Sequence, residues 1–154
     1  VWERQEFIEK TEGNVVDYER IRTKINEIAL DYSIQEIAYD PWNATHLATE
    51  LGEQDGFEMV EFRQGFKSMN EPSKELERLI ISGGISHGAN PVFRWAASNV
   101  SVKTDPAGNI KPDKQKSTEK IDPIVALVMA LGRAMVGAEQ KTGSVYDTRG
   151  LEWV

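Results

Sequence analysis

One long apolar segment near the end of the chain, residues 122–136, constrains the fold more than any other. Asp122 and Pro123 open it, and these residue types favour the cap and the first turn of a helix. Apolar residues then occupy nearly every side of the predicted helix: Ile124, Val125, Ala126, Leu127, Val128, Ala130, Leu131, Ala134 and Val136. A helix of this kind is buried on more than one side, so we expect other elements to pack around it.

Helical and extended patterns alternate in the first half of the chain. Residues 17–32 carry apolar side chains at three- and four-residue spacings, which predicts an amphipathic helix. Residues 34–39 form a short apolar run typical of a buried strand, a helix follows, and residues 57–62 are the next predicted strand. Helix, strand, helix, strand is typical of an α/β sheet.

The remaining segments are shorter. We expect a helix that starts at Pro72, a short helix after Pro91, and a hairpin around the turn-rich sequence Asp-Pro-Ala-Gly-Asn at residues 105–109. Residues 1–12 alternate charged and apolar positions in a pattern that fits either a helix or a strand.

The composition is that of a soluble globular protein, with 154 residues of which 40% are hydrophobic and 28% charged. We expect a single domain over residues 1–154, with a polar tail from about residue 137. No apolar run approaches the roughly 18 residues that span a bilayer, so no membrane association is expected. There is no cysteine, which excludes disulfides and thiolate chemistry and fits a reducing cytoplasm.

Two aspartates stand at the ends of predicted elements. Asp40 follows the strand over residues 34–39 and precedes a proline, and Asp122 precedes a proline at the start of the last helix. Active sites of open α/β sheets lie beyond the carboxyl ends of strands, and paired carboxylates there suit Mg²⁺ or Mn²⁺. Each aspartate also has a structural explanation, as a turn residue and as a helix cap, and nothing in the composition places them together.

Other candidate residues are a histidine and a group of lysines. His87 lies in a glycine-rich loop that would let a ligand approach, although a hydrogen-bonded surface histidine is the alternative. The net charge of −7 argues against a broad nucleic-acid-binding surface, yet four lysines gather at Lys111, Lys114, Lys116 and Lys120. These lysines either contact phosphate groups or form a solvated loop. The chain contains no G-x-x-x-x-G-K-[ST], G-x-S-x-G or H-E-x-x-H motif.

Six segments carry distinctive residue combinations: G-N-V-V-D-Y (13–18), E-I-A-Y-D-P-W-N-A (36–44), F-R-Q-G (62–65), S-K-E-L-E-R-L-I (73–80), H-G-A-N-P-V-F-R-W-A-A-S-N (87–99) and K-I-D-P-I-V-A-L-V-M-A-L-G-R-A (120–134). In this order they resemble the C-terminal nuclease region of the large terminase subunit of tailed bacteriophages and prophages. The resemblance spans roughly residues 10–136.

The resemblance implies an RNase H-like fold, with a mixed central sheet flanked by helices. It also implies a metal-dependent endonuclease that cuts concatemeric double-stranded DNA. The family's Tyr-Asp-Pro-Trp aspartate matches Asp40, and the aspartate that opens the family's last helix matches Asp122, so both are expected to be catalytic and to bind two Mg²⁺ or Mn²⁺ ions in the complete domain. The residues expected to hold the DNA backbone are Lys114, Lys116, Lys120, Arg63 and Arg94, with His87 as an auxiliary candidate.

The resemblance to this family also implies binding partners and a subcellular location. An ATPase motor domain precedes the nuclease domain in this family, and the small terminase subunit and the portal or prohead are the expected partners, in the cytoplasm of the bacterial host. The first acidic ligand of the family lies on the first strand of its sheet, upstream of every segment matched here. Since the sequence also begins with Val1, we expect a domain that lacks its first strand or strands, and whose activity by itself is in question. The sheet edge left exposed invites pairing, so we expect dimerisation.

Two other interpretations stay open. The domain could be a non-catalytic docking module that presents its lysine loop and tail to a portal, a capsid or a small terminase subunit. A junction resolvase or integrase core would share the RNase H-like fold but would lack the extended motif match.

Overall fold

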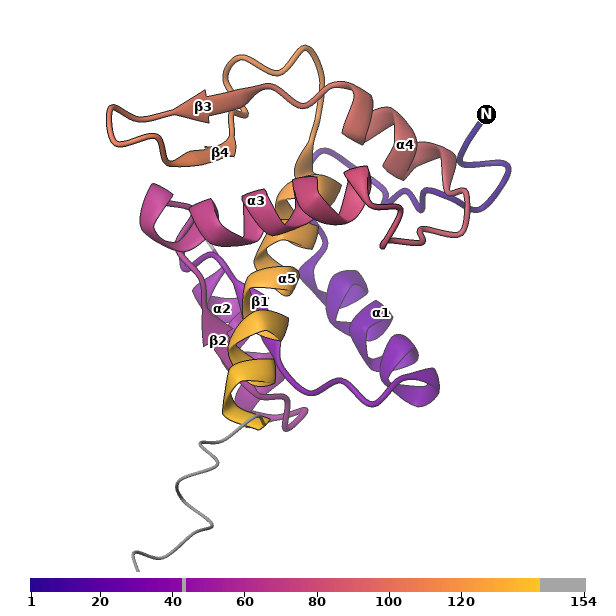
Figure 1. Ribbon diagram of the computed structural model, residues 1–154. Helices are drawn as coiled ribbons and strands as arrows, with labels where there is room; N and C mark the ends of the chain where they lie inside the picture. The colour runs from indigo at the N-terminus through magenta and orange to yellow at the C-terminus, as the bar shows by residue number, and fades with distance from the viewer. Residues whose placement is uncertain (43, 142–154) are drawn as a thin grey trace, which may run out of the picture.

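The computed structural model describes residues 1–42 and 44–141. Within them, helices and strands follow in the order α1 (Tyr18–Asp31), β1 (Ile37–Tyr39), α2 (Thr45–Glu53), β2 (Met59–Glu61), α3 (Phe66–Ile81), α4 (Pro91–Ser98), β3 (Val102–Thr104), β4 (Ile110–Pro112) and α5 (Asp122–Lys141) (Figure 1). The predicted α/β class is confirmed. The last helix extends past the predicted start of the tail near residue 137, and the rest of that tail lies outside the described residues. No helix in the described ranges is long and apolar enough to cross a membrane.

The first sheet is a parallel pair. Ile37 lies opposite Met59, and α2 makes the crossover connection that parallel neighbours require. The inner side of α2 is anchored by Leu51, which is fully buried. Each strand pairs over three residues, so both are shorter than the predicted runs over residues 34–39 and 57–62.

The second sheet is the predicted hairpin of β3 and β4, with Lys103 opposite Lys111. Its turn is held by the carboxylate of Asp105, which accepts the N–H groups of Ala107 and Asn109, each at 2.9 Å. The sequence predicted one mixed central sheet, and this expectation is wrong for the described residues, in which the parallel pair and the antiparallel pair are separate.

A buried asparagine attaches the hairpin to α3. Asn70 of α3 is 7% exposed, and its side-chain oxygen accepts the N–H of Ile110 at 2.9 Å. This N–H faces away from β3, so without Asn70 it would be available to pair with a further strand. The hairpin therefore docks on α3 instead of joining β1 and β2, as the stacking in Figure 1 shows.

The last helix forms the centre of the core. α5 packs against α3, α4 and β1, which confirms the predicted burial on more than one side. The buried cluster consists of Phe62, Met69, Leu76, Ala96, Ile121, Ile124, Val125, Val128 and Met129. Gly132 lets the ring of Phe62 approach α5, because a Cβ at this position would lie 2.9 Å from that ring.

The start of α3 differs from the prediction. The helix begins at Phe66, and Pro72 lies inside it. An interior proline removes one helical hydrogen bond and costs roughly 3 kcal/mol. Met69, Pro72 and Leu76 are buried on one face, and this burial, largely against α5, offsets the cost. Tertiary packing thus overrides the local signal that proline opens a helix.

The N-terminal quarter of the molecule is packed more loosely. Residues 1–16 form turns instead of the predicted helix or strand, with the ring of Trp2 edge-on to that of Trp95 at 5.5 Å. Asp17 caps α1 by accepting the N–H of Arg20 at 2.9 Å. No residue of α1 is fully buried, and its firmest attachment is a pair of 2.6 Å hydrogen bonds from Arg22 to Asp55.

Candidate metal and nucleic-acid site

Asp40 lies where the sequence placed it, directly after β1. Its carboxylate accepts the N–H of Trp42 at 3.1 Å, which closes a tight turn over Pro41. The side chain is half-buried, while the Trp42 side chain is 82% exposed. Asp40 thus presents a carboxylate at the carboxyl end of a parallel strand, the position at which α/β sheets carry their sites.

Asp122 is the first residue of α5, and it binds a lysine. The Nζ of Lys114 lies 2.7 Å from one of its carboxylate oxygens. The hydrogen bond from Lys114 lowers the pKa of Asp122; partial burial opposes this, and the charge of Lys120 adds to the lowering. Asp122 is therefore a carboxylate held in its charged form by cations.

Three contacts show how the two aspartates are placed. Glu36 accepts hydrogen bonds from Arg133 at 2.7 and 2.9 Å, the ring of Phe62 lies against Gly132, and the Gln64 side chain lies 3.7 Å from the sulfur of Met129. Residues closer to the carboxyl ends of the strands thus contact residues closer to the start of α5. The helix runs opposite to the strands, so Asp122 lies beyond the same end of the sheet as Asp40.

The two carboxylates engage different partners, Asp40 the N–H of Trp42 and Asp122 the ammonium group of Lys114. Within residues 1–42 and 44–141, no three His, Asp or Glu side chains converge to hold a metal ion. Carboxylate oxygens are ligands that Mg²⁺ and Mn²⁺ prefer, so Asp40 and Asp122 fit such an ion in chemistry but supply two donors instead of a full set.

The predicted lysine loop is ordered by a buried aspartate. Asp113 is 6% exposed, and its carboxylate accepts the N–H groups of Gln115 and Lys116 at 3.0 and 3.4 Å. Its own N–H donates to the carbonyl of Ser101 at 2.8 Å. These bonds turn the chain outward, so Lys114, Lys116 and Lys120 are exposed on a fixed loop beside Asp122.

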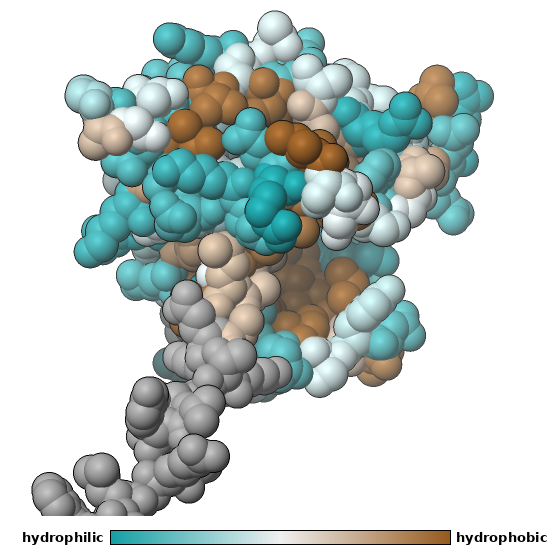
Figure 2. Space-filling model, in the orientation of Figure 1, coloured by the Kyte–Doolittle hydropathy of each residue, from teal (hydrophilic) through white to brown (hydrophobic). Residues whose placement is uncertain are grey.

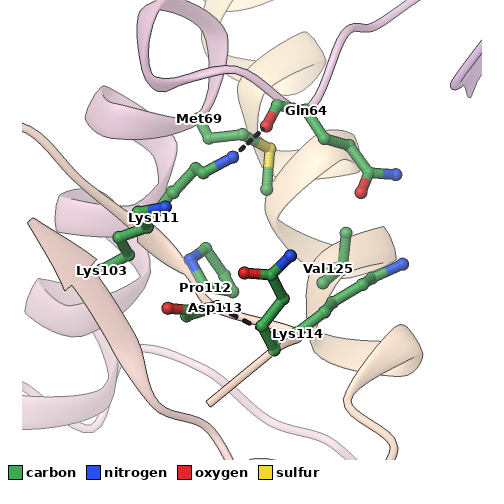
Figure 3. A pocket seen from close by; sticks show the side chains of 9 residues that line it. Gln64, Met69, Lys103, Lys111, Pro112, Asp113, Lys114 and Val125 are labelled. Carbon is green, nitrogen blue, oxygen red and sulfur yellow. Dashed lines mark hydrogen bonds between the residues drawn. The ribbon is translucent and has the colours of Figure 1, made fainter. Parts of the chain in front are cut away.

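A hollow of about 200 Å³ lies next to this loop, between α3, the hairpin and α5. Figure 3 shows its lining: Gln64, Met69, Lys103, Lys111, Pro112, Asp113, Lys114, Gln115 and Val125. Lys103 and Asp113 are not among the residues that the sequence predicts for the site, and Lys111 belongs to the predicted lysine group but not to the residues expected to hold the DNA backbone. The hairpin register would have revealed the lysine pair, because a turn in which Asp105 lies opposite Asn109 places Lys103 opposite Lys111.

The other predicted residues lie apart from this hollow. Arg63 is exposed just after β2. His87 stacks on Phe93 with ring centres 5.5 Å apart, and with Arg94 it lines a second, open hollow of about 310 Å³. The two hollows share no lining residue, so the structure does not bring His87 and Arg94 to the lysine loop.

Carboxylates beyond one end of the parallel strands, with lysines beside them, are side chains of the types that phosphate-ester chemistry uses. The sequence model described as the terminase large subunit, endonuclease domain, matches residues 1–138. The chain therefore belongs to the family of terminase large subunit endonuclease domains.

Individual relatives agree. The chain is 35% identical over 148 residues to the large terminase subunit of Enterobacteria phage HK97, which covers 96% of this chain and 29% of the relative. It is 36% identical over 143 residues to protein YmfN of Escherichia coli K12, covering 92% of this chain and 31% of the relative. The crystal structure of the HK97 large terminase superimposes with a TM-score of 0.79 at 36% identity, over 86% of this chain and 28% of that one. The chain thus spans about three-tenths of the length of these relatives.

Proposed function

We propose that this domain is a metal-dependent endonuclease of a viral DNA-packaging terminase, with an RNase H-like fold, that cleaves concatemeric double-stranded DNA. The observation that carries the proposal is the placement of Asp40 and Asp122. In a chain of this family, Asp40 directly follows the carboxyl end of β1, and Asp122 is the first residue of the central helix, beyond the same end of the parallel strands.

Asp40 and Asp122 are the residues that would hold Mg²⁺ or Mn²⁺, with two ions in the complete domain and a further acidic ligand from outside this chain. The bound ions would supply an activated water and stabilise the leaving oxygen of the phosphodiester. Asp122 is suited to this role because Lys114 and Lys120 keep its carboxylate charged. Asp40 is suited because the short turn through Trp42 fixes its direction.

The exposed cations would hold the DNA backbone. Lys116 and Lys120 lie on the ordered loop beside Asp122, and Lys114 can exchange its carboxylate partner for a phosphate. Arg63 lies at the end of β2, and Arg94 with His87 would contact a more distant part of the duplex. Contacts of this kind position the duplex without reading bases, so we expect little sequence specificity.

The partners follow from the family. The domain would follow a terminase ATPase domain in the polypeptide. It would act together with the small terminase subunit and the portal or prohead, in the cytoplasm of the host bacterium.

A plasmid-cleavage assay with Mn²⁺ tests the proposal. It compares this chain, a longer form of the polypeptide extended upstream, and the longer form carrying Asp40→Ala or Asp122→Ala. We expect the longer form to cut and both substitutions to reduce the cutting rate at least about a hundred-fold. The control is Asp31→Ala, at an exposed aspartate at the end of α1, which should leave the rate unchanged. Cutting by both site variants would show that the carboxylate assignment is wrong. A longer form that never cuts would instead favour the non-catalytic docking role.

A further inference from the structure

Two lysines face each other across the hairpin without an acidic partner. Lys103 and Lys111 are directly opposed in the antiparallel register, so their side chains lie on the same face of the hairpin. Like charges in this arrangement are unfavourable. Within the described residues, neither lysine forms an ion pair. The Nζ of Lys111 instead donates to the backbone carbonyl of Gln64 at 2.7 Å and lies 5.3 Å from the ring centre of Phe66.

The carboxylates near this pair are committed elsewhere. Asp113 lines the same hollow, but its carboxylate accepts two backbone N–H groups of its own loop. Asp122 is occupied by Lys114, which also lines the hollow and so connects it to the candidate metal site. Three lysines therefore line one hollow, in which Asp113 is the single carboxylate among the lining residues.

The size and floor of the hollow indicate what fits. Its volume of about 200 Å³ is far above the roughly 10–15 Å³ that one water needs, yet below the roughly 300 Å³ at which pockets for drug-sized ligands begin. Met69, which is 1% exposed, and Val125 form an apolar floor. An anion beside such a floor is screened less than in open water, so it interacts more strongly with the lysines.

We propose that this hollow binds one backbone phosphate of the DNA duplex through Lys103 and Lys111, next to the phosphodiester that is cleaved. The inference rests on the proposed function and goes beyond it by assigning a phosphate subsite to the hairpin. Lys114, between the hollow and Asp122, sets the register of the bound strand. A strand held in this way passes Asp122 on its way out of the hollow.

The test is DNA binding without metal. A fluorescently labelled duplex is titrated with the chain in EDTA at several NaCl concentrations, and anisotropy gives the dissociation constant. We expect Lys103→Gln and Lys111→Gln each to weaken binding several-fold, and the slope of log K against log salt to fall by about one for each lysine removed. Lys24→Gln, which removes the same charge from α1, should change neither quantity. Because Lys111 is partly buried, the exposed Lys103 is the decisive position if Lys111→Gln unfolds.

Each outcome has a defined meaning. Unchanged duplex binding and salt slope in Lys103→Gln would overturn the subsite, whether or not the longer polypeptide cuts DNA. Competition by inorganic phosphate with no binding of the duplex would also overturn it, because the hollow would then take a free anion. Lysine-dependent binding in a protein whose longer form does not cut would support the subsite while the nuclease proposal failed.

Discussion

At the scale of single residues, the two aspartates and Gly132 show which structural roles can be predicted from the local sequence and which cannot. Asp40 and Asp122 were identified because each precedes a proline at the boundary of an apolar element, and both lie at those boundaries. Their partners, Trp42 and Lys114, were not foreseen, because turn geometry and loop path decide them. Gly132 gave no signal in the sequence, since its role is to make room for a ring 70 positions away.

Gly132→Ala should destabilise the protein. The added methyl group would lie 2.9 Å from the Phe62 ring and 3.2 Å from Pro72, so α5 or its neighbours must shift, which costs about 1–3 kcal/mol. Urea unfolding followed by circular dichroism measures the change. Gly137→Ala is the matched control in the same helix, where nothing lies within 4 Å, and it should stabilise by about 0.5–1 kcal/mol. Equal effects of the two substitutions would show that the close approach at residue 132 is unimportant.

A second residue-scale prediction concerns acid. The hydrogen bond from Arg22 lowers the pKa of Asp55 below its ordinary value of 3.8, while burial opposes this and a hydrogen bond from Asn26 adds to the lowering. A carboxyl group with a lowered folded-state pKa stabilises the fold above the ordinary value, and the contribution is lost as pH falls from about 3.8 through the folded-state pKa. Since Asp55 attaches α1, the amide protection factors of α1, which correct for the intrinsic pH dependence of exchange, should fall in this window before those of α5 do.

The variant Asp55→Asn isolates this effect. It should raise exchange in α1 already at neutral pH and reduce the acid dependence of that helix, to which the ion pairs of Glu27 with Lys24 and Arg20 also contribute. Asp31→Asn on the same helix, which involves no such ion pair, should leave the acid dependence in place. If α1 and α5 open together at every pH in the unmodified chain, the attachment through Arg22 and Asp55 does not control α1.

At the scale of elements, the segments with strong local signals were predicted and the long-range ones were not. The Asp-Pro start of α5, the Pro91 start of α4 and the turn of the hairpin at Asp105 are all local, and all are confirmed. The start of α3 was misplaced at Pro72 because burial against α5 outweighs the proline signal. The hairpin is docked on α3 through a hydrogen bond between Asn70 and Ile110, 40 positions apart, for which the sequence holds no pattern.

Asn70→Ala should loosen the hairpin. The substitution leaves the N–H of Ile110 without its acceptor, and an unsatisfied buried donor costs about 1–3 kcal/mol. We expect a loss of stability of that size in urea unfolding, together with faster amide exchange at residues 102–112 than in the rest of the chain. The exposed Glu77→Ala on the same helix is the control and should leave the hairpin protected. A uniform rise in exchange over all elements would argue against a specific role of Asn70 in docking the hairpin.

At the scale of the whole molecule, exposed surfaces gather around the parallel sheet and α1. The N–H of Ile37 and the carbonyl of Tyr39 bond to the β2 segment, so the N–H of Ala38 faces the opposite edge of β1. The exposed apolar side chains near and on α1 are Val15, Val16, Tyr18, Ile21, Ile28, Leu30 and Tyr32. Figure 2 shows apolar surface in the recess between α1 and α5. An open strand edge and an apolar helix face both favour association with another chain.

Self-association should therefore depend on the β1 edge. Sedimentation velocity at rising protein concentration is expected to show a dimer, in line with the dimerisation that the sequence predicts. Ala38→Pro removes the outward N–H while leaving the bonds to the β2 segment intact, so it should shift the dimer to a monomer. Leu30→Lys, at a side chain that is 87% exposed, tests the helix face separately. A dimer that survives Ala38→Pro and is lost in Leu30→Lys would assign association to α1, and a single-chain mass at the highest concentration would contradict dimerisation altogether.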